Sequence, residues 1–120
     1  PYNIGGLTQQ TALALLRQYD LFQNRRTGII LERERLIREL RGLGIFQRVY
    51  DSEANFILVI TEFCQKLYRY LIACRVVVRL RDIPPLIGGG IRITVGTREE
   101  NDRLLEVLHK YDNVMEVNAL

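Results

Sequence analysis

Apolar residues recur with two different periods along this chain of 120 residues. Over 27–44 they return every three or four positions, which is typical of one face of an α-helix. The residues on this stripe are Ile29, Ile30, Leu36, Ile37, Leu40 and Leu43. The helix is expected to stop at Gly42 or Gly44, because glycine can take the left-handed conformation of a helix cap. A shorter helix is predicted from Leu7 to about Tyr19-Asp20.

Two further helices are predicted from their N-terminal signals. Thr61 is expected to cap a helix that buries Phe63, Leu67 and Leu71. Thr97 and Glu100 have the spacing of a capping box, which predicts a helix over 98–110.

β-Strands are predicted where apolar residues are continuous or alternate. The run "NFILVI" at 55–60 indicates a buried strand, and "RVVVRL" at 75–80 is β-branched and indicates a strand at 76–80. Over 91–95, Ile91, Ile93 and Val95 point to one face, and Arg92 lies on the other. The segment "RDIPPLIGGG" at 81–90 is expected to be a loop, and the tail "NVMEVNAL" an edge strand.

This order of elements predicts the α+β class. We expect a small, mostly antiparallel sheet with helices packed on one face, in β-α-β-β-α order, preceded by a long helix. The chain is treated as a single domain over 1–120. It divides into a leading segment with a short helix at 1–24, a long helix at 25–44 and an α/β sandwich at 45–120.

Two arginines are expected to face each other across this sheet. If the strands at 76–80 and 91–95 form a symmetric antiparallel hairpin, Arg79 lies opposite Arg92. Guanidinium groups about 5 Å apart at the backbone are unfavourable unless an anion lies beside them. Arginine binds carboxylates and phosphates with paired N–H donors. Alternatively, each arginine pairs with a local acid or points into water.

Composition excludes several classes of function. The net charge is +3, with arginines spread among glutamates, so we expect no nucleic-acid partner. No apolar run reaches the roughly 18 residues of a membrane span. One histidine, His109, and the distant Cys64 and Cys74 do not form a metal-binding spacing. Ten residues on one helix would separate the cysteines by about 15 Å, so we expect free thiols and a cytoplasmic protein.

Several of these segments together resemble a known family. They are "PYNIGGLTQQTALALL" at 1–16, "SEANFILV" at 52–59, "VVVR" at 76–79 and "IRITVGTREENDRLLEVL" at 91–108. The set is similar to the C-terminal small domain of histidinol-phosphate aminotransferases, enzymes of the pyridoxal-phosphate-dependent transferase fold. By this resemblance, Arg92 binds the substrate carboxylate and Arg79 binds the phosphate of histidinol phosphate. Asn55 takes a supporting role, or is simply a strand-entry residue that bonds nearby backbone.

The resemblance also implies what the chain lacks. The family holds pyridoxal 5′-phosphate through a lysine of its large domain, which this chain does not contain. The only lysines here, Lys66 and Lys110, have the pattern of solvated helix residues. The chain begins with Pro1, so we expect a piece of a longer protein that binds no cofactor and is inactive by itself. One departure from the family is Arg75, where glycine often precedes the strand.

The implied full-length enzyme transfers an amino group between glutamate and imidazole-acetol phosphate in histidine biosynthesis. Its expected partners are small molecules, namely glutamate, 2-oxoglutarate and histidinol phosphate, and it is expected to be a homodimer. Two alternatives stay open. One is a stand-alone ferredoxin-like module that binds or senses a small molecule, and the other is a domain of a related aromatic amino-acid aminotransferase.

Overall fold

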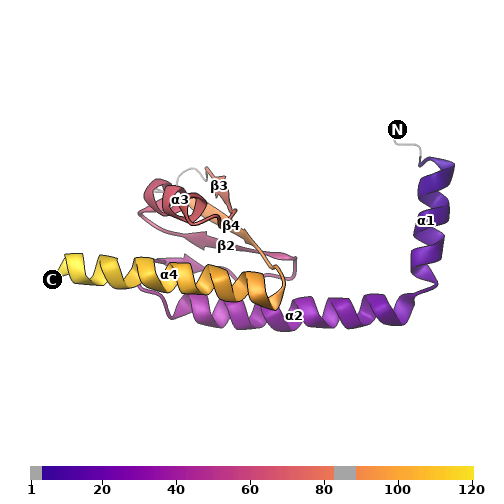
Figure 1. Ribbon diagram of the computed structural model, residues 1–120, viewed down its shortest axis with the longest axis horizontal. Coiled ribbons are helices and arrows are strands. Elements are labelled where there is room, and N and C mark those ends of the chain that lie inside the picture. Colours follow the sequence, from indigo (N-terminus) through magenta and orange to yellow (C-terminus); the bar gives the residue numbers. More distant parts are fainter. Residues whose placement is uncertain (1–3, 83–88) are drawn as a thin grey trace.

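The computed structural model describes residues 4–82 and 89–120. Within these ranges the chain forms, in order, α1 (Gly6–Leu16), α2 (Tyr19–Arg41), β1 (Arg48–Val49), β2 (Phe56–Ile60), α3 (Cys64–Ala73), β3 (Arg79–Arg81), β4 (Gly90–Thr94) and α4 (Arg98–Ala119) (Figure 1). The predicted α+β class is confirmed. Six residues of the expected loop, 83–88, lie outside the described residues.

The four strands form one antiparallel sheet in the order β1-β2-β4-β3. β4 therefore lies between β2 and β3, although it is the last strand in the chain. The predicted register of the hairpin is confirmed, because Arg79 pairs with Arg92. Of the predicted strand at 76–80, only Arg79 and Leu80 join the ladder, because β3 runs from Arg79 to Arg81.

One face of the sheet carries the hydrophobic core. The side chains of Ile57, Val59, Ile91 and Ile93 are almost completely buried there. They belong to one cluster with the inner residues of three helices: Leu36 and Leu40 of α2, Leu67 and Leu71 of α3, and Leu104 and Leu108 of α4. Because α2, α3 and α4 all pack on this face, no helix of the described residues covers the opposite face of the sheet, here called the open face.

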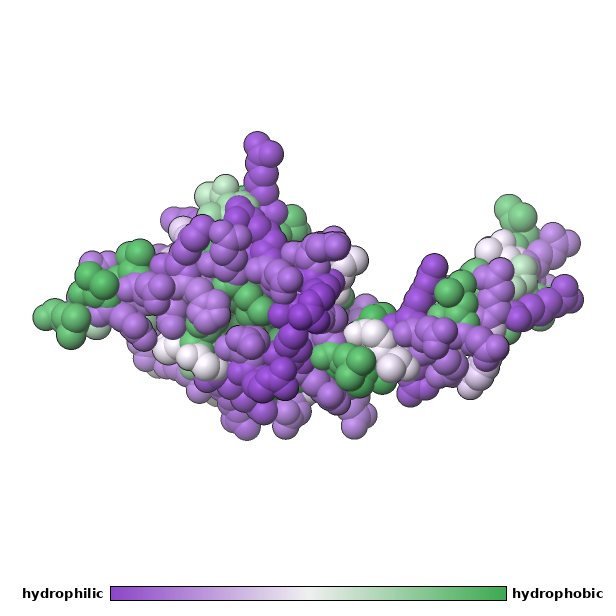
Figure 2. All heavy atoms as spheres, turned by 60° about the horizontal axis from the view of Figure 1, so that its bottom comes forward, coloured by the Kyte–Doolittle hydropathy of each residue, from purple (hydrophilic) through white to green (hydrophobic). Residues whose placement is uncertain are grey.

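The N-terminal part of the structure projects away from this core (Figure 1). This projecting arm consists of α1 and the first half of α2, residues 4–31. No residue of α1 is buried, and the buried residues of α2 all lie in its second half. Leu7, Leu13 and Leu16 are exposed, and Figure 2 shows apolar side chains on the surface of the arm. The molecule consequently measures 60 × 32 × 26 Å. No helix in the described ranges is both long and apolar enough to span a membrane.

Helix boundaries differ from the prediction at the N-terminal end. α1 ends at Leu16, and α2 begins at Tyr19, six residues before the expected start at 25. Gly28 lies inside α2, because one glycine costs a helix only about 1 kcal/mol and does not stop it. The predicted stop is confirmed, because α2 ends at Arg41 with Gly42 as its C-cap, but the left-handed conformation is not, since Gly42 has a φ of −77° in the right-handed helical region.

The edge strand predicted for the tail is also wrong, because α4 continues to Ala119. Tyr111 and Met115, four residues apart, pack against the core and extend the helical period of Leu104 and Leu108. Val114 and Val117, which made the tail look like a strand, are 58% and 69% exposed. Their spacing of three positions places them together on the outer side of the helix.

The two predicted N-terminal caps have different outcomes. Thr61 does not cap α3, which begins at Cys64; its hydroxyl oxygen accepts a hydrogen bond from the Phe63 N–H (3.2 Å) and closes the preceding turn. The capping box of α4 is confirmed. The Thr97 hydroxyl accepts from the Glu100 N–H (3.3 Å), and the Glu100 carboxylate accepts from the Thr97 N–H (2.8 Å).

Candidate functional site

A row of side chains crosses the open face of the sheet. Leu58 of β2 lies opposite Arg92 of β4, which lies opposite Arg79 of β3. Tyr50 extends this row at the other edge, because its N–H donates to the Leu58 carbonyl oxygen (3.0 Å). Directly opposed residues of neighbouring strands point to the same face. The structure thus brings together the two arginines that the sequence indicated.

Arg92 leans over a phenylalanine of the adjacent strand. Its guanidinium carbon lies 4.9 Å from the centre of the Phe56 ring. Phe56 itself pairs with Thr94, two positions along β4, so the contact is diagonal across the two strands. A cation over an aromatic face is attracted by the negative charge on that face. This contact orients the half-buried arginine side chain.

Neither arginine forms an ion pair with an acid in the described part of the chain. The ion pairs found in residues 4–82 and 89–120 involve other groups, and no hydrogen bond from the Arg79 or Arg92 side chain is present there. The Cα atoms of these paired residues are about 4.5–5.5 Å apart. Two adjacent cations without a local acid form a surface that favours an anion.

Asn55 lies away from this pair. Its backbone carbonyl oxygen accepts from the Val95 N–H (2.8 Å), which continues the ladder beyond Phe56 and Thr94. Alternation along the strands therefore places Asn55 and Val95 on the helix-covered face. There Asn55 lines a surface hollow with residues of α2 such as Arg33. The structure does not bring Asn55 together with Arg79 and Arg92, and its position is that of a strand-entry residue.

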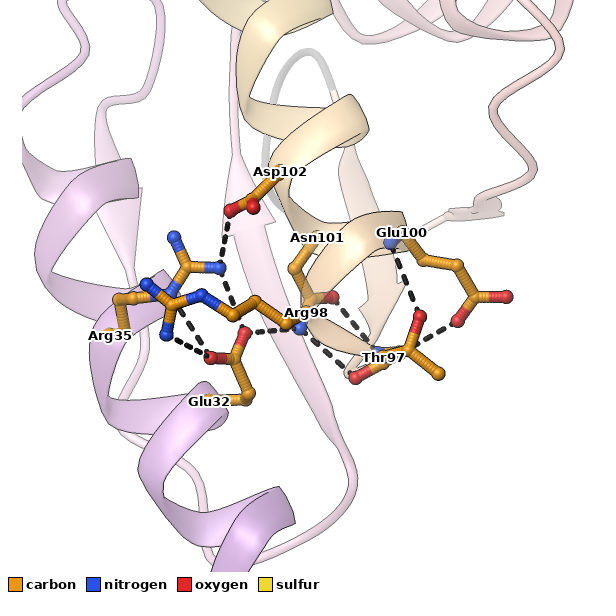
Figure 3. Close-up of polar contacts among 8 residues, drawn as sticks. Glu32, Arg35, Thr97, Arg98, Glu100, Asn101 and Asp102 are labelled. Carbon is orange, nitrogen blue, oxygen red and sulfur yellow. Dashed lines mark hydrogen bonds and ion pairs between the residues drawn. The ribbon is translucent and has the colours of Figure 1, made fainter.

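A polar network fixes the junction between β4 and α4 (Figure 3). The buried Asn101 side chain holds Gly96 from both sides: its oxygen accepts from the Gly96 N–H, and its nitrogen donates to the Gly96 carbonyl oxygen, each at 3.0 Å. Asn101 also donates to Glu32 of α2 (2.9 Å). A Cβ at position 96 would run into the Glu100 carboxylate, so a larger residue there would displace the side chain that accepts from Thr97.

Glu32 is the centre of this network. Arg35 donates to it (2.9 Å and 3.2 Å), and Arg98 approaches to 3.4 Å. The hydrogen bonds from Arg35, and then from Asn101, lower the pKa of the Glu32 carboxyl below its ordinary value. The run "GTREEN", which carried much of the family resemblance, is thus largely explained by structure.

The chain's own residues do not fit a covalently held cofactor. Lys66 is exposed on α3, and the Lys110 ammonium is exposed and donates to Glu106 (2.7 Å). Neither ammonium group lies in an enclosed site. Both cysteines are free thiols, and burial raises the pKa of the Cys64 thiol, which makes it a poor nucleophile. His109 is exposed near the middle of α4.

No protein-family model matches this chain. A histidinol-phosphate aminotransferase of Flavobacterium psychrophilum is 41% identical over 109 residues, 90% of this chain and 31% of the relative. The enzyme of the same name from Cytophaga hutchinsonii is 42% identical over 111 residues, 92% of this chain and 32% of the relative. The chain is a relative of the histidinol-phosphate aminotransferases. It spans about a third of their length.

Solved structures agree with this relationship. The histidinol-phosphate aminotransferase from Clostridium acetobutylicum superposes with a TM-score of 0.82 at 28% identity, over 94% of this chain and 35% of that one. A decarboxylase from Sulfurospirillum multivorans superposes with a TM-score of 0.76 at 26% identity, over 92% and 33% of the two chains. The fold predicted here, part of the aminotransferase fold, is therefore confirmed.

Sequence reasoning missed Phe56 and Tyr50 as parts of the site. Phe56 belongs to β2 and Tyr50 follows β1, and where these segments lie relative to β4 depends on the whole sheet order. The hairpin of β3 and β4 could be aligned from two neighbouring segments. No local pattern indicates that β2 lies on the other side of β4, so Phe56 gave no signal of its contact with Arg92.

Proposed function

We propose that this chain is the substrate-positioning part of a histidinol-phosphate aminotransferase. Such an enzyme exchanges an amino group between glutamate and imidazole-acetol phosphate in histidine biosynthesis. The observation that carries the proposal is the pairing of Arg79 with Arg92 on the open face, without an acid partner among the described residues. The names of the relatives support the reaction.

In this proposal the two arginines bind different groups of the substrates. Arg92 holds a carboxylate, shared by glutamate and its keto acid, and Arg79 holds the phosphate of histidinol phosphate. Each contact is charge-assisted and bidentate, which fixes the orientation of the substrate as well as its affinity. Holding the reacting carbon in one place is how a positioning domain contributes to the rate.

Pyridoxal phosphate belongs to the rest of the longer enzyme. When bound, it supplies the electron sink that amino-group transfer requires. Lys66 and Lys110 do not fit the role of its anchor, so the anchor lies outside this chain. We also propose that the full-length enzyme is a cytoplasmic homodimer, as the two free thiols and the resemblance suggest.

The two other candidates make different demands on the site. A stand-alone ferredoxin-like module is disfavoured, because nine-tenths of the chain is similar to one part of a larger enzyme. An aromatic amino-acid aminotransferase has no phosphate to bind, so it has no use for Arg79. Because the Sulfurospirillum decarboxylase shares the fold, the fold alone does not select the reaction.

The test uses the enzyme that contains this chain. Arg92→Lys keeps the charge but loses the bidentate grip, and we expect kcat/KM for glutamate to fall roughly 10- to 1000-fold, about 1.4–4 kcal/mol. Arg79→Lys should reduce kcat/KM chiefly for histidinol phosphate. Arg69→Lys, at an exposed position of α3, is the matched control and should be silent. Unchanged glutamate turnover in Arg92→Lys would contradict the carboxylate role, and equal losses for phosphorylated and unphosphorylated substrates in Arg79→Lys would contradict the phosphate role.

A further inference from the structure

The Nε atom of Arg92 is shut off from solvent. It is buried and has no hydrogen-bond partner among the described residues. Arginine has five N–H donors, one on Nε and four on the two Nη atoms. The two terminal Nη atoms of Arg92 also make no hydrogen bond to the described residues, but unlike Nε they are not shut off from solvent. The donors that a ligand can reach are therefore at the tip of the side chain.

Phe56 is placed to produce this arrangement. It lies on β2, on the side of β4 away from β3 and Arg79. With its guanidinium 4.9 Å from the ring centre, Arg92 leans toward β2 and away from the second cation. On the open face its neighbours along β4 are Gly90 and Thr94, which are too small to hold a long side chain in one rotamer.

We propose that Phe56 is a positioning residue for Arg92. Its ring holds the guanidinium toward β2 and shields Nε, so that the two Nη atoms grip a substrate carboxylate end-on. A side-on contact would use the Nε–H, and it is blocked because Nε is buried. The same lean leaves Arg79 free to take a separate anionic group. The inference rests on the proposed function, since it assigns Phe56 a role in the same substrate site.

Two variants distinguish the effect of the aromatic ring of Phe56 from the effect of its apolar volume. Phe56→Leu keeps an apolar side chain but removes the aromatic face, and Phe56→Tyr keeps the ring as the matched control. In the longer enzyme we expect Phe56→Leu to raise KM for glutamate about 3- to 30-fold, the range of a cation–π contact, with a smaller change in kcat. Phe56→Tyr should stay within about 2-fold of the parent. If Phe56→Leu does not fold, Phe56→Met supplies the same comparison.

A double-mutant cycle tests whether Phe56 acts through Arg92. In an Arg92→Met background, Phe56→Leu should add almost nothing, because the cation that it positions is gone. A loss as large as in the parent would show that Phe56 only supports the fold, and it would overturn the inference. So would an unchanged KM for glutamate in folded Phe56→Leu.

A spectroscopic readout on the chain itself does not depend on turnover. In a proton–nitrogen NMR spectrum, the shielded Arg92 Nε–H should exchange slowly and be shifted by the Phe56 ring current. The signal should persist in Phe56→Tyr and be lost in Phe56→Leu; a fast-exchanging Nε–H in the parent would overturn the shielding.

The outcomes also separate this inference from the proposed function. If Arg92→Lys is silent toward glutamate, both fail together. If Arg92→Lys is harmful and Phe56→Leu is silent, only the positioning role fails.

Discussion

At the end of α3, Arg75 has a backbone conformation that normally favours glycine. Its φ is +61°, in the left-handed region. Its N–H donates to the Ile72 carbonyl oxygen (2.9 Å), and the Val76 N–H donates to that of Leu71 (2.8 Å). These two bonds form a Schellman motif, in which the left-handed residue ends the helix. The departure from the family noted at this position is thus a strained residue in an otherwise ordinary helix end.

Replacing this residue by glycine should stabilise the chain. A residue with a Cβ destabilises the fold by about 1–2 kcal/mol in the left-handed conformation. Glycine avoids this strain, but about 0.5–1 kcal/mol of the gain is lost because glycine has more conformational freedom in the unfolded chain. We therefore expect Arg75→Gly to raise the free energy of unfolding by about 0.5–1 kcal/mol, measured by urea denaturation. Arg75→Ala is the control, because it removes the side chain and keeps the strain. An equal gain in both variants would show that the side chain, and not φ, is responsible.

Asp112 is a second residue whose role is visible only in the structure. This buried carboxylate accepts from the Gly44 N–H (3.1 Å) and the Ile45 N–H (2.9 Å). It thereby ties the turn after α2 to α4. An aspartate in a run of polar and apolar residues looks like an exposed position in the sequence. Its burial depends on two backbone donors almost 70 positions away, which no sequence pattern reveals.

Among the elements, α4 has the clearest start signal in the sequence. Thr97→Ala removes the acceptor of the Glu100 N–H and should lower the free energy of unfolding by roughly 1 kcal/mol. Thr97→Ser keeps the hydroxyl oxygen and should stay close to the parent. Denaturant midpoints of the three proteins make the comparison. A loss of the same size in both variants would point to the lost methyl group instead of the cap.

The contact between α2 and α4 should depend on pH through Glu32. Because the pKa of this carboxyl is lowered in the folded chain, its ionised form stabilises the fold. That contribution is complete above the ordinary pKa of 4.5 and is lost as the pH falls through the lower folded value. We expect Glu32→Gln to cost about 1–3 kcal/mol at pH 7 and progressively less below pH 4.5.

Glu34→Gln is the control for this prediction. Glu34 is exposed on the same helix and forms no ion pair with the described residues. Its substitution should change the free energy of unfolding little at any pH. A Glu32→Gln difference that stays constant from pH 7 to pH 3 would contradict the role of the ionised carboxylate.

The elements differ in how far the sequence could predict them. The stripe of α2, the buried strand β2 and the capping box of α4 each follow from residues close together in the chain, and all three were found. The start of α2 and the end of α4 were not, because each end is exposed and lacks a stop signal at the predicted place. The Arg79 and Arg92 pair was found because a hairpin aligns neighbouring strands, whereas Phe56 needed the complete sheet order.

At the scale of the whole molecule, the chain has a buried core but also exposes apolar side chains on the projecting arm and two arginines on the open face. The projecting arm exposes leucines on α1 that a folded protein usually covers. The open face likewise presents Arg79 and Arg92 to whatever packs or binds there. Both features agree with a chain that spans about a third of its relatives.

This chain alone should not take up pyridoxal phosphate. The expectation follows from Lys66 and Lys110, which are both exposed and lie outside any enclosed site. Titrating the purified chain with the cofactor should leave only the visible spectrum of the free cofactor plus weak, non-stoichiometric changes. A stoichiometric, pH-dependent absorption band that disappears in Lys66→Arg or Lys110→Arg would overturn the prediction.

The central place of β4 has a consequence for synthesis on the ribosome. Residues 56–60 emerge first and find only β1 as a neighbour, and residues 79–81 emerge with no strand to pair with. The sheet can close only after Thr94 has left the exit tunnel. Until then the edges of β2 and β3 are free to pair with another nascent chain, which is when unpaired strands aggregate. A pause in translation after Thr94 has left the exit tunnel would let the sheet form, and a pause before Gly90 has left it would prolong the exposure of both edges.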